Sequence, residues 1–138
     1  MMINLQSFKN KIMKALKITY WITTGLVVLT MLFSFFNYFF NPAMVGAYAH
    51  AGFPDWFRVE LGIAKLLGAL ALGIPAVPGR VKEWAYVGFF INFFSAILAH
   101  NQINDPIGTQ IFPFVILLIL VASYVTFHKV MVTKTAKI

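Results

Sequence analysis

Four long apolar runs divide this sequence and constrain its fold more than any other feature. They cover residues 18–40, 56–74, 84–99 and 111–127. A helix needs about 20 apolar residues to cross a hydrocarbon core about 30 Å thick. Period-two alternation is absent from the runs, and only helices or closed barrels satisfy their backbone hydrogen bonds in lipid. With their flanks counted, the runs predict an all-α integral membrane four-helix bundle with helices at about 18–40, 56–74, 82–100 and 109–128.

The composition agrees with this prediction and excludes a soluble globular domain. Hydrophobic residues make up 60% of the 138 residues and charged residues 11%, whereas soluble domains carry roughly 25% charged residues. The net charge of +7 does not indicate nucleic-acid binding, because the basic residues lie at the ends of the apolar runs and form no patch. We therefore expect a single domain over 1–138 with the lipid bilayer as its partner.

The distribution of lysine and arginine predicts the orientation in the membrane. One side of the bundle receives Lys9, Lys11, Lys14, Lys17, Arg80, Lys82, Lys129, Lys134 and Lys137. The opposite connections, 41–55 and 101–110, contain no lysine or arginine. The positive-inside rule then places both termini in the cytoplasm.

A cleaved signal peptide is the alternative interpretation of the N-terminal segment. A basic arm and an apolar run precede "AYA" at 47–49, which resembles a cleavage site. The apolar region of a signal peptide spans about 7–15 residues. The run over 18–40 is longer, and Asn41-Pro42 separates it from "AYA". We therefore expect it to remain as the first membrane helix.

The connection after the first run contains the signals of a short helix. Asn41 suits an N-cap, Pro42 the first helical position and Gly52 the stop. These residues predict an interfacial helix over 42–51. Asp55 is then predicted to cap the second membrane helix.

Glu60 and Lys65 interrupt the second apolar run. Lys65 lies about 13 Å along the helix from Trp56, close to the membrane midplane, where a lysine costs roughly 2.5–3.5 kcal/mol. The two charged residues are about 140° apart around the helix, so they do not form an i,i+4 pair. Each could find a partner on another helix, or the two could meet through water inside the bundle.

The predicted site is a polar pocket between the second and third membrane helices, open to the outer face. Its candidate ligand-binding residues are Glu60, Lys65, Asn92, Ser95 and His100. Asn92 has the depth needed to reach Lys65. The alternative is that these groups are buried contacts that fix helix packing. No catalytic residue is identified.

The second apolar run also contains an arginine near its start and three glycines. Arg58 is expected to anchor the helix at the outer interface. Gly62, Gly68 and Gly73 are expected to be positions of close helix packing.

Cysteine is absent, which excludes disulfides and iron–sulfur ligation within this chain. His50 and His100 are both expected on the outer side, with Asp55 or Asp105 near them, whereas His128 lies at the cytoplasmic end. A haem would need the first two histidines together. Interfacial histidines are the alternative, and no metal site is predicted.

Two blocks, "RVELGIAKLLGALAL" and "PAVPGRVKEWAYVGFFINFFSAILAH", and the later "SYVTFHK" closely resemble the DoxX-like family of small four-helix bacterial membrane proteins. The resemblance covers nearly the whole chain from residue 18 onward. It implies a multi-pass protein of the bacterial inner membrane. The positions that match the family motif are Glu60, Lys65, Lys82, Glu83 and Trp84.

The resemblance also implies a choice of functions. Some relatives in the broader DoxX group resemble subunits of quinone-linked sulfur oxidoreductases or of oxidant-defence complexes, and distant relatives act as assembly factors. This implies a membrane subunit or accessory of a quinone-linked oxidoreductase, with quinone as the candidate cofactor and a redox subunit as the partner. Lys65 would then hydrogen-bond a quinone oxygen.

Other functions remain open beside this one. A non-catalytic assembly or structural protein is the first alternative, and a small-solute transporter is less favoured. The absence of cysteine argues against sulfur-transfer chemistry within this chain. Whether the chain is itself an enzyme stays open, and a homo-oligomer is a further expectation.

Overall fold

The computed structural model describes residues 2–103 and 105–136, with side chains placed in 4–103 and 105–131. The helices are α1 (Met2–Phe40), α2 (Pro42–His50), α3 (Asp55–Gly73), α4 (Gly79–Gln102) and α5 (Ile107–Ala136). The described residues form no strand, which confirms the all-α prediction. Lys137 and the side chain of Lys134, which entered the charge argument above, lie outside the described part.

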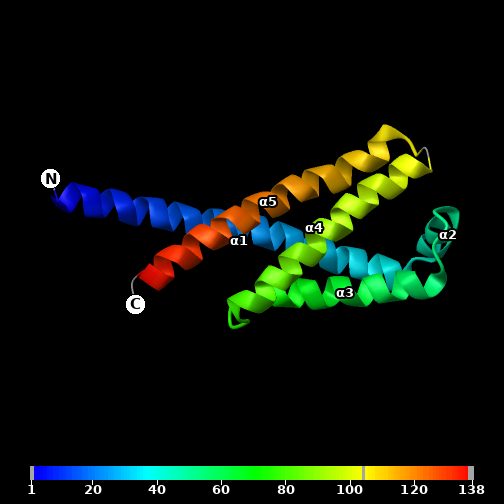
Figure 1. Cartoon of the computed structure of the whole chain (residues 1–138), viewed down its shortest axis with the longest axis horizontal. Coiled ribbons are helices and arrows are strands. Elements are labelled where there is room, and N and C mark those ends of the chain that lie inside the picture. The colour runs from blue at the N-terminus through cyan, green and yellow to red at the C-terminus, as the bar shows by residue number, and fades with distance from the viewer. Residues whose placement is uncertain (1, 104, 137–138) are drawn as a thin grey trace.

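The four long helices run alternately in opposite directions (Figure 1). α1 packs against α3 and α5, and α4 packs against the same two helices. Among the described helices, the short α2 packs against α1 and α3. We call the end with α2 and the α4–α5 connection the α2 end. The opposite end, where the α3–α4 connection lies and α1 extends outward, is the basic end.

Within the part of the chain that the structure describes, three helices are long and apolar enough to cross a membrane: Asn4–Phe40, Gly79–Gln102 and Ile107–Met131. α3 does not join them, because its 19 residues include Asp55, Arg58, Glu60 and Lys65. Its length is still about 28 Å at 1.5 Å per residue. The sequence predicts four spans, and the structure supports three. Whether α3 can lie in lipid depends on the helices that shield its charges.

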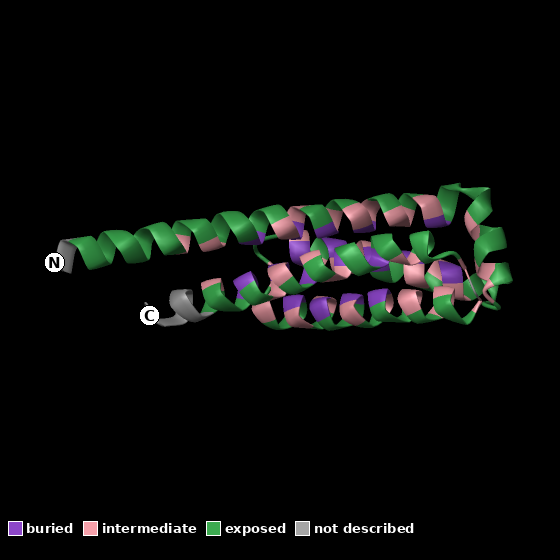
Figure 2. Ribbon diagram, turned by 90° about the horizontal axis from the view of Figure 1, so that it is seen from above, coloured by how far each residue is buried: buried purple, intermediate pink, exposed green. Residues whose placement is uncertain are grey.

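α1 is longer than the predicted span over 18–40, because it begins at Met2. Its first turns extend beyond the other helices and are exposed (Figure 2). The extension contains no glycine or proline and is rich in lysine, leucine and methionine, which favour helix. The basic N-terminal arm of the sequence is therefore the start of the first helix.

α2 confirms the helix predicted over 42–51. The Oδ1 atom of Asn41 accepts a hydrogen bond from the backbone N–H of Ala43 at 3.0 Å. Pro42 follows it as the first helical residue. Gly52 comes after the helix with φ at 85°, a conformation that glycine adopts most easily.

The predicted cap of α3 is wrong by one residue. Pro54 occupies the N-cap position and makes no side-chain cap bond, whereas Asp55 is the first helical residue. The carboxylate of Asp55 accepts a hydrogen bond from Nε of Arg58 at 2.8 Å. The side chain of Asp55 therefore bonds to an arginine one turn away and does not cap the backbone of the first turn.

The core lies between the four long helices, and their outer faces are apolar. Val27 of α1, Leu72 of α3 and Leu120 of α5 are fully buried. Large apolar side chains such as Phe33 and Leu67 are exposed on the outside. Exposed apolar surface of this extent is expected of helices that face lipid.

Two of the three predicted packing glycines lie at close helix contacts. A Cβ atom at Gly62 would lie 2.6 Å from Cε2 of Phe39. A Cβ atom at Gly68 would lie 2.4 Å from Cζ of Phe89. At Gly73 the nearest atom would be at 3.5 Å, an ordinary contact. Gly62 and Gly68 therefore let α1 and α4 approach α3, whereas Gly73 is not needed for packing.

Candidate functional site

Lys65 lies inside the helix assembly and is only 7% exposed. Its Nζ atom donates hydrogen bonds to Oγ of Ser34 and to the hydroxyl of Tyr38, each at 3.0 Å. The same atom lies 4.2 Å from the centroid of the Tyr38 ring, within the range of a cation–π contact. No carboxylate within the described side chains pairs with it. Lys65 thus connects α3 with α1 through two hydrogen bonds to hydroxyl groups and a cation–π contact with the Tyr38 ring.

A chain of hydroxyl groups leads from Lys65 to the α2 end. The hydroxyl of Tyr38 is hydrogen-bonded to that of Tyr48, which belongs to α2. Burial, followed by the neighbouring Tyr38, raises the pKa of Tyr48 above its ordinary value. Tyr48 therefore keeps its proton at neutral pH, and the chain remains intact.

The other predicted pocket residues make no hydrogen bond or ion pair with Lys65 in the described part of the chain. Glu60 is exposed on the outer face of α3, and it makes no hydrogen bond or ion pair with any residue of the described part. Asn92 is half-buried and Ser95 is exposed on α4, and neither bonds to Lys65. His100 lies in the last turn of α4, at the α2 end. No hydrogen bond or ion pair connects any two of these five residues in the described part of the chain.

Arg58 is a second buried cation, with 9% of its surface exposed. Its Nη1 atom donates a hydrogen bond to the backbone oxygen of Tyr38, in the last turn of α1. The final carbonyl groups of a helix lack partners within it and carry a partial negative charge. Arg58, which the sequence suggests as an anchor at the outer interface, therefore caps the C-terminal end of α1.

Lys82 makes the same type of contact with the end of α3. It is 5% exposed. Its Nζ atom donates hydrogen bonds to the backbone oxygens of Ala71 at 2.8 Å, Leu72 at 3.1 Å and Ile74 at 2.9 Å. Sequence reasoning missed this role. The available signal was the position of Lys82 at the start of a helix that follows a short proline-containing connection.

The two other motif positions have different surroundings. Glu83 pairs with His128 and so connects α4 with α5 at the basic end. Trp84 is exposed on the outer surface of α4. The motif positions Lys82, Glu83 and Trp84 therefore do not form one site.

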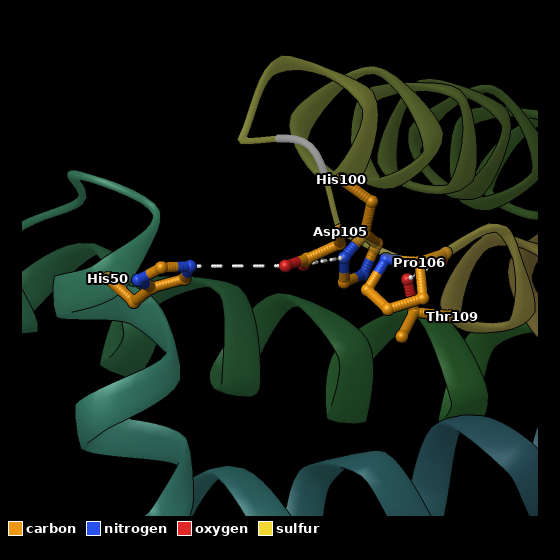
Figure 3. A network of polar contacts seen from close by, with 5 residues as sticks. All are labelled: His50, His100, Asp105, Pro106 and Thr109. Carbon is orange, nitrogen blue, oxygen red and sulfur yellow. Dashed lines mark hydrogen bonds and ion pairs between the residues drawn. The ribbon is translucent and has the colours of Figure 1, made fainter.

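His50 and His100 lie at the same end of the molecule, on the two oxygens of one carboxylate (Figure 3). Nδ1 of His100 is 2.7 Å from Oδ2 of Asp105. Nε2 of His50 is 3.9 Å from Oδ1 of the same residue. No group of three or more histidine, aspartate or glutamate residues among the described ones has a geometry that could hold a metal. The contacts instead connect α2 with the α4–α5 connection.

A second group of hydroxyls lies in the half nearer the basic end. Oγ of Ser123 is 2.6 Å from Oγ1 of Thr24 and 2.7 Å from the hydroxyl of Tyr86. All three residues are fully buried, and they come from α5, α1 and α4. Such hydrogen bonds between side chains of different helices stabilise the packing of membrane helices.

The structure also contains a cavity that the sequence did not predict. It has a volume of about 560 Å³ and lies at the basic end, between α1, the α3–α4 connection and the end of α5. Lys17, Tyr20, Trp21 and Lys82 contribute to its lining. None of the five predicted pocket residues borders it.

Comparison with known proteins supports the resemblance seen in the sequence. The model of the DoxX-like family matches residues 22–123. The match runs from the packed part of α1 to the middle of α5 and includes Lys65 and Lys82. No curated protein and no solved structure matches the chain.

Proposed function

Since this chain belongs to the DoxX-like family, we propose that it is a multi-pass protein of the bacterial inner membrane. Its four long helices form a membrane bundle with both termini in the cytoplasm. It serves as a non-catalytic membrane subunit or accessory of a quinone-linked oxidoreductase. Electron transfer then belongs to the partner subunit.

The distribution of charge supports the orientation. The exposed basic residues of α1, including Lys9 and Lys14, lie at the basic end together with Arg80. At the α2 end the sequence contains Arg58 alone, and it is buried. Basic residues favour the cytoplasmic side of a membrane. The basic end is therefore the cytoplasmic one.

An unpaired carboxylate on the outer face of α3 is the observation that carries the proposed role. Glu60 lies about 7 Å from the start of the helix, in an exposed row with Trp56, Ile63 and Leu67. An ionised group among lipid-facing side chains is costly, and such groups usually have partners. A neighbouring membrane helix that offers a cation or an N–H donor would remove that cost. We therefore place the partner subunit on this face.

The partner-binding role predicts a specific loss in Glu60→Leu. We expect capture of the redox subunit to fall about ten-fold or more, as expected when a desolvated charge contact is removed. Thermal stability should stay equal or rise, because Glu60 has no partner within the described part of the chain. Affinity purification in mild detergent, followed by quantitative mass spectrometry, measures the capture.

Asp105→Asn is the matched control, because it removes a carboxylate at the same end of the molecule but not on the α3 face. Undiminished capture by Glu60→Leu would rule out this face as the docking surface. A second copy of the chain bound there, detected as a change in mass by light scattering, would favour the homo-oligomer instead.

The charge on Lys65 favours a second candidate function, direct binding of a quinone. The ammonium group is not neutralised by a carboxylate in the described part, so it could donate a hydrogen bond to a quinone oxygen. The packing does not fit the ligand, however. Lys65 is buried, and the cavity of about 560 Å³ does not border it. The geometry therefore favours the non-catalytic role.

Lys65→Met distinguishes the two candidates. We expect partner-dependent quinone turnover in native membranes to remain within about two-fold of wild type. We also expect thermal stability to fall, because two hydrogen bonds donated by a charged group are lost. Lys14→Met, on the exposed extension of α1, is the control. Loss of turnover in a folded Lys65→Met protein would favour quinone binding at Lys65.

A further inference from the structure

The cavity at the basic end takes no part in the function proposed above. We propose that it binds the head group of an anionic phospholipid, with the ammonium group of Lys17 paired to the lipid phosphate. This proposal does not depend on the oxidoreductase role.

The cavity lies at a level in the membrane that suits a lipid head group. Tyr20 and Trp21 line it, and they lie where the apolar run of α1 begins. Tyrosine and tryptophan are enriched at the membrane–water interface, at the level of the head groups. Ala76, in the α3–α4 connection, also lines it. The cavity is therefore located at the surface of the leaflet that faces the basic end.

The charges of the lining favour an anion. Lys17 is exposed and makes no hydrogen bond or ion pair within the described side chains. Lys82 adds a second positive charge, although its hydrogen bonds are already made to the end of α3. None of the described residues that line the cavity is acidic. Basic pockets between membrane helices on the cytoplasmic side are suited to anionic head groups.

The remaining walls favour a ligand with an apolar part. Phe127, Val130 and Met131 of α5 line the cavity beside Trp21 of α1. A free phosphate ion would gain nothing from these side chains. An acyl chain would bury apolar surface against them while its phosphate reached Lys17. Because one ligand uses both kinds of wall, we assign the site to a lipid.

Native mass spectrometry of the full chain in detergent tests this assignment. Phosphatidylglycerol and phosphatidylcholine with the same acyl chains are the two probes. We expect wild type to retain phosphatidylglycerol preferentially. Lys17→Gln should weaken that retention about five-fold, the effect of one lysine near an anionic surface. Lys14→Gln, one turn away and not part of the lining, should change it by less than about two-fold.

Ala76→Trp provides a test that leaves the charges unchanged. Ala76 is exposed in the α3–α4 connection, so a larger side chain can fill the cavity without entering the core. We expect this variant to lose phosphatidylglycerol while keeping its thermal stability.

Three outcomes would overturn the proposal. Equal retention of the two lipids would exclude recognition of the anionic head group. Equal losses in Lys17→Gln and Lys14→Gln would show that general charge attraction explains binding. Displacement of phosphatidylglycerol by excess inorganic phosphate, with the same dependence on Lys17, would assign the site to free phosphate.

Discussion

Lys82→Met is expected to lower the free energy of unfolding by about 3 kcal/mol or more. The ammonium group of Lys82 is buried and donates to three backbone oxygens at the end of α3. Hydrogen bonds to charged groups contribute about 1.5–3 kcal/mol each, and a buried acceptor left without a donor is costly. Methionine fills a similar volume, so the loss reports the missing cap and not a cavity.

Unfolding in mixed micelles with increasing denaturing detergent, followed by circular dichroism, measures this effect. Arg80→Met is the control, because it removes an exposed charge two positions earlier on the same helix. We expect its effect to stay within about 0.5 kcal/mol, as for most surface substitutions. Backbone hydrogen exchange at the end of α3 should rise in Lys82→Met alone. Equal stability of the two variants would show that the carbonyl groups do not need Lys82.

The parts of the fold that could be predicted depend on local signals. Asn41, Pro42 and Gly52 define α2 because capping, a fixed φ and a positive φ each act within a few residues. The caps made by Arg58 and Lys82 were not predictable in this way. Each reaches the end of the preceding long helix, and that contact exists only after the helices have packed.

The sequence predicts how far along its helix Lys65 lies, but not which neighbouring helix it faces. Lys65 was expected near the middle of a helix assembly, and it is buried there. Depth along the helices alone favours Asn92 as its partner. Ser34 and Tyr38 of α1 are the actual partners, because the rotation of α3 about its axis turns Lys65 toward α1. Distance along a helix follows from residue number, whereas this rotation depends on packing.

The position of Glu60 also depends on the rotation of α3, which residue number does not give. The spacing of Glu60 and Lys65, about 140° around a helix, argues against an i,i+4 pair between them. With Lys65 turned inward, Glu60 faces outward and lies unpaired in the described structure. The spacing disfavours an i,i+4 pair, and the packing shows that Glu60 is the residue on the outside.

Gly68→Leu is expected to lower the free energy of unfolding by about 3 kcal/mol or more, or to prevent assembly of α3 with α4. A Cβ atom at Gly68 would lie 2.4 Å from Cζ of Phe89 and 2.9 Å from Cε1. Phe89 is 4% exposed in the core, so its ring cannot move into solvent. Overpacking of a close-packed core typically costs 1–3 kcal/mol, and leucine adds further atoms beyond Cβ.

Gly25→Leu is the matched control, because nothing lies within 4 Å of a Cβ atom at that position. It raises helix propensity as much as Gly68→Leu does, and should therefore leave stability unchanged or increase it. The double variant Gly68→Leu/Phe89→Ala should recover part of the loss, since the smaller alanine vacates the space that leucine needs. Residues in contact give non-additive energies. Strictly additive losses in the double variant would show that Gly68 does not set the distance between α3 and α4.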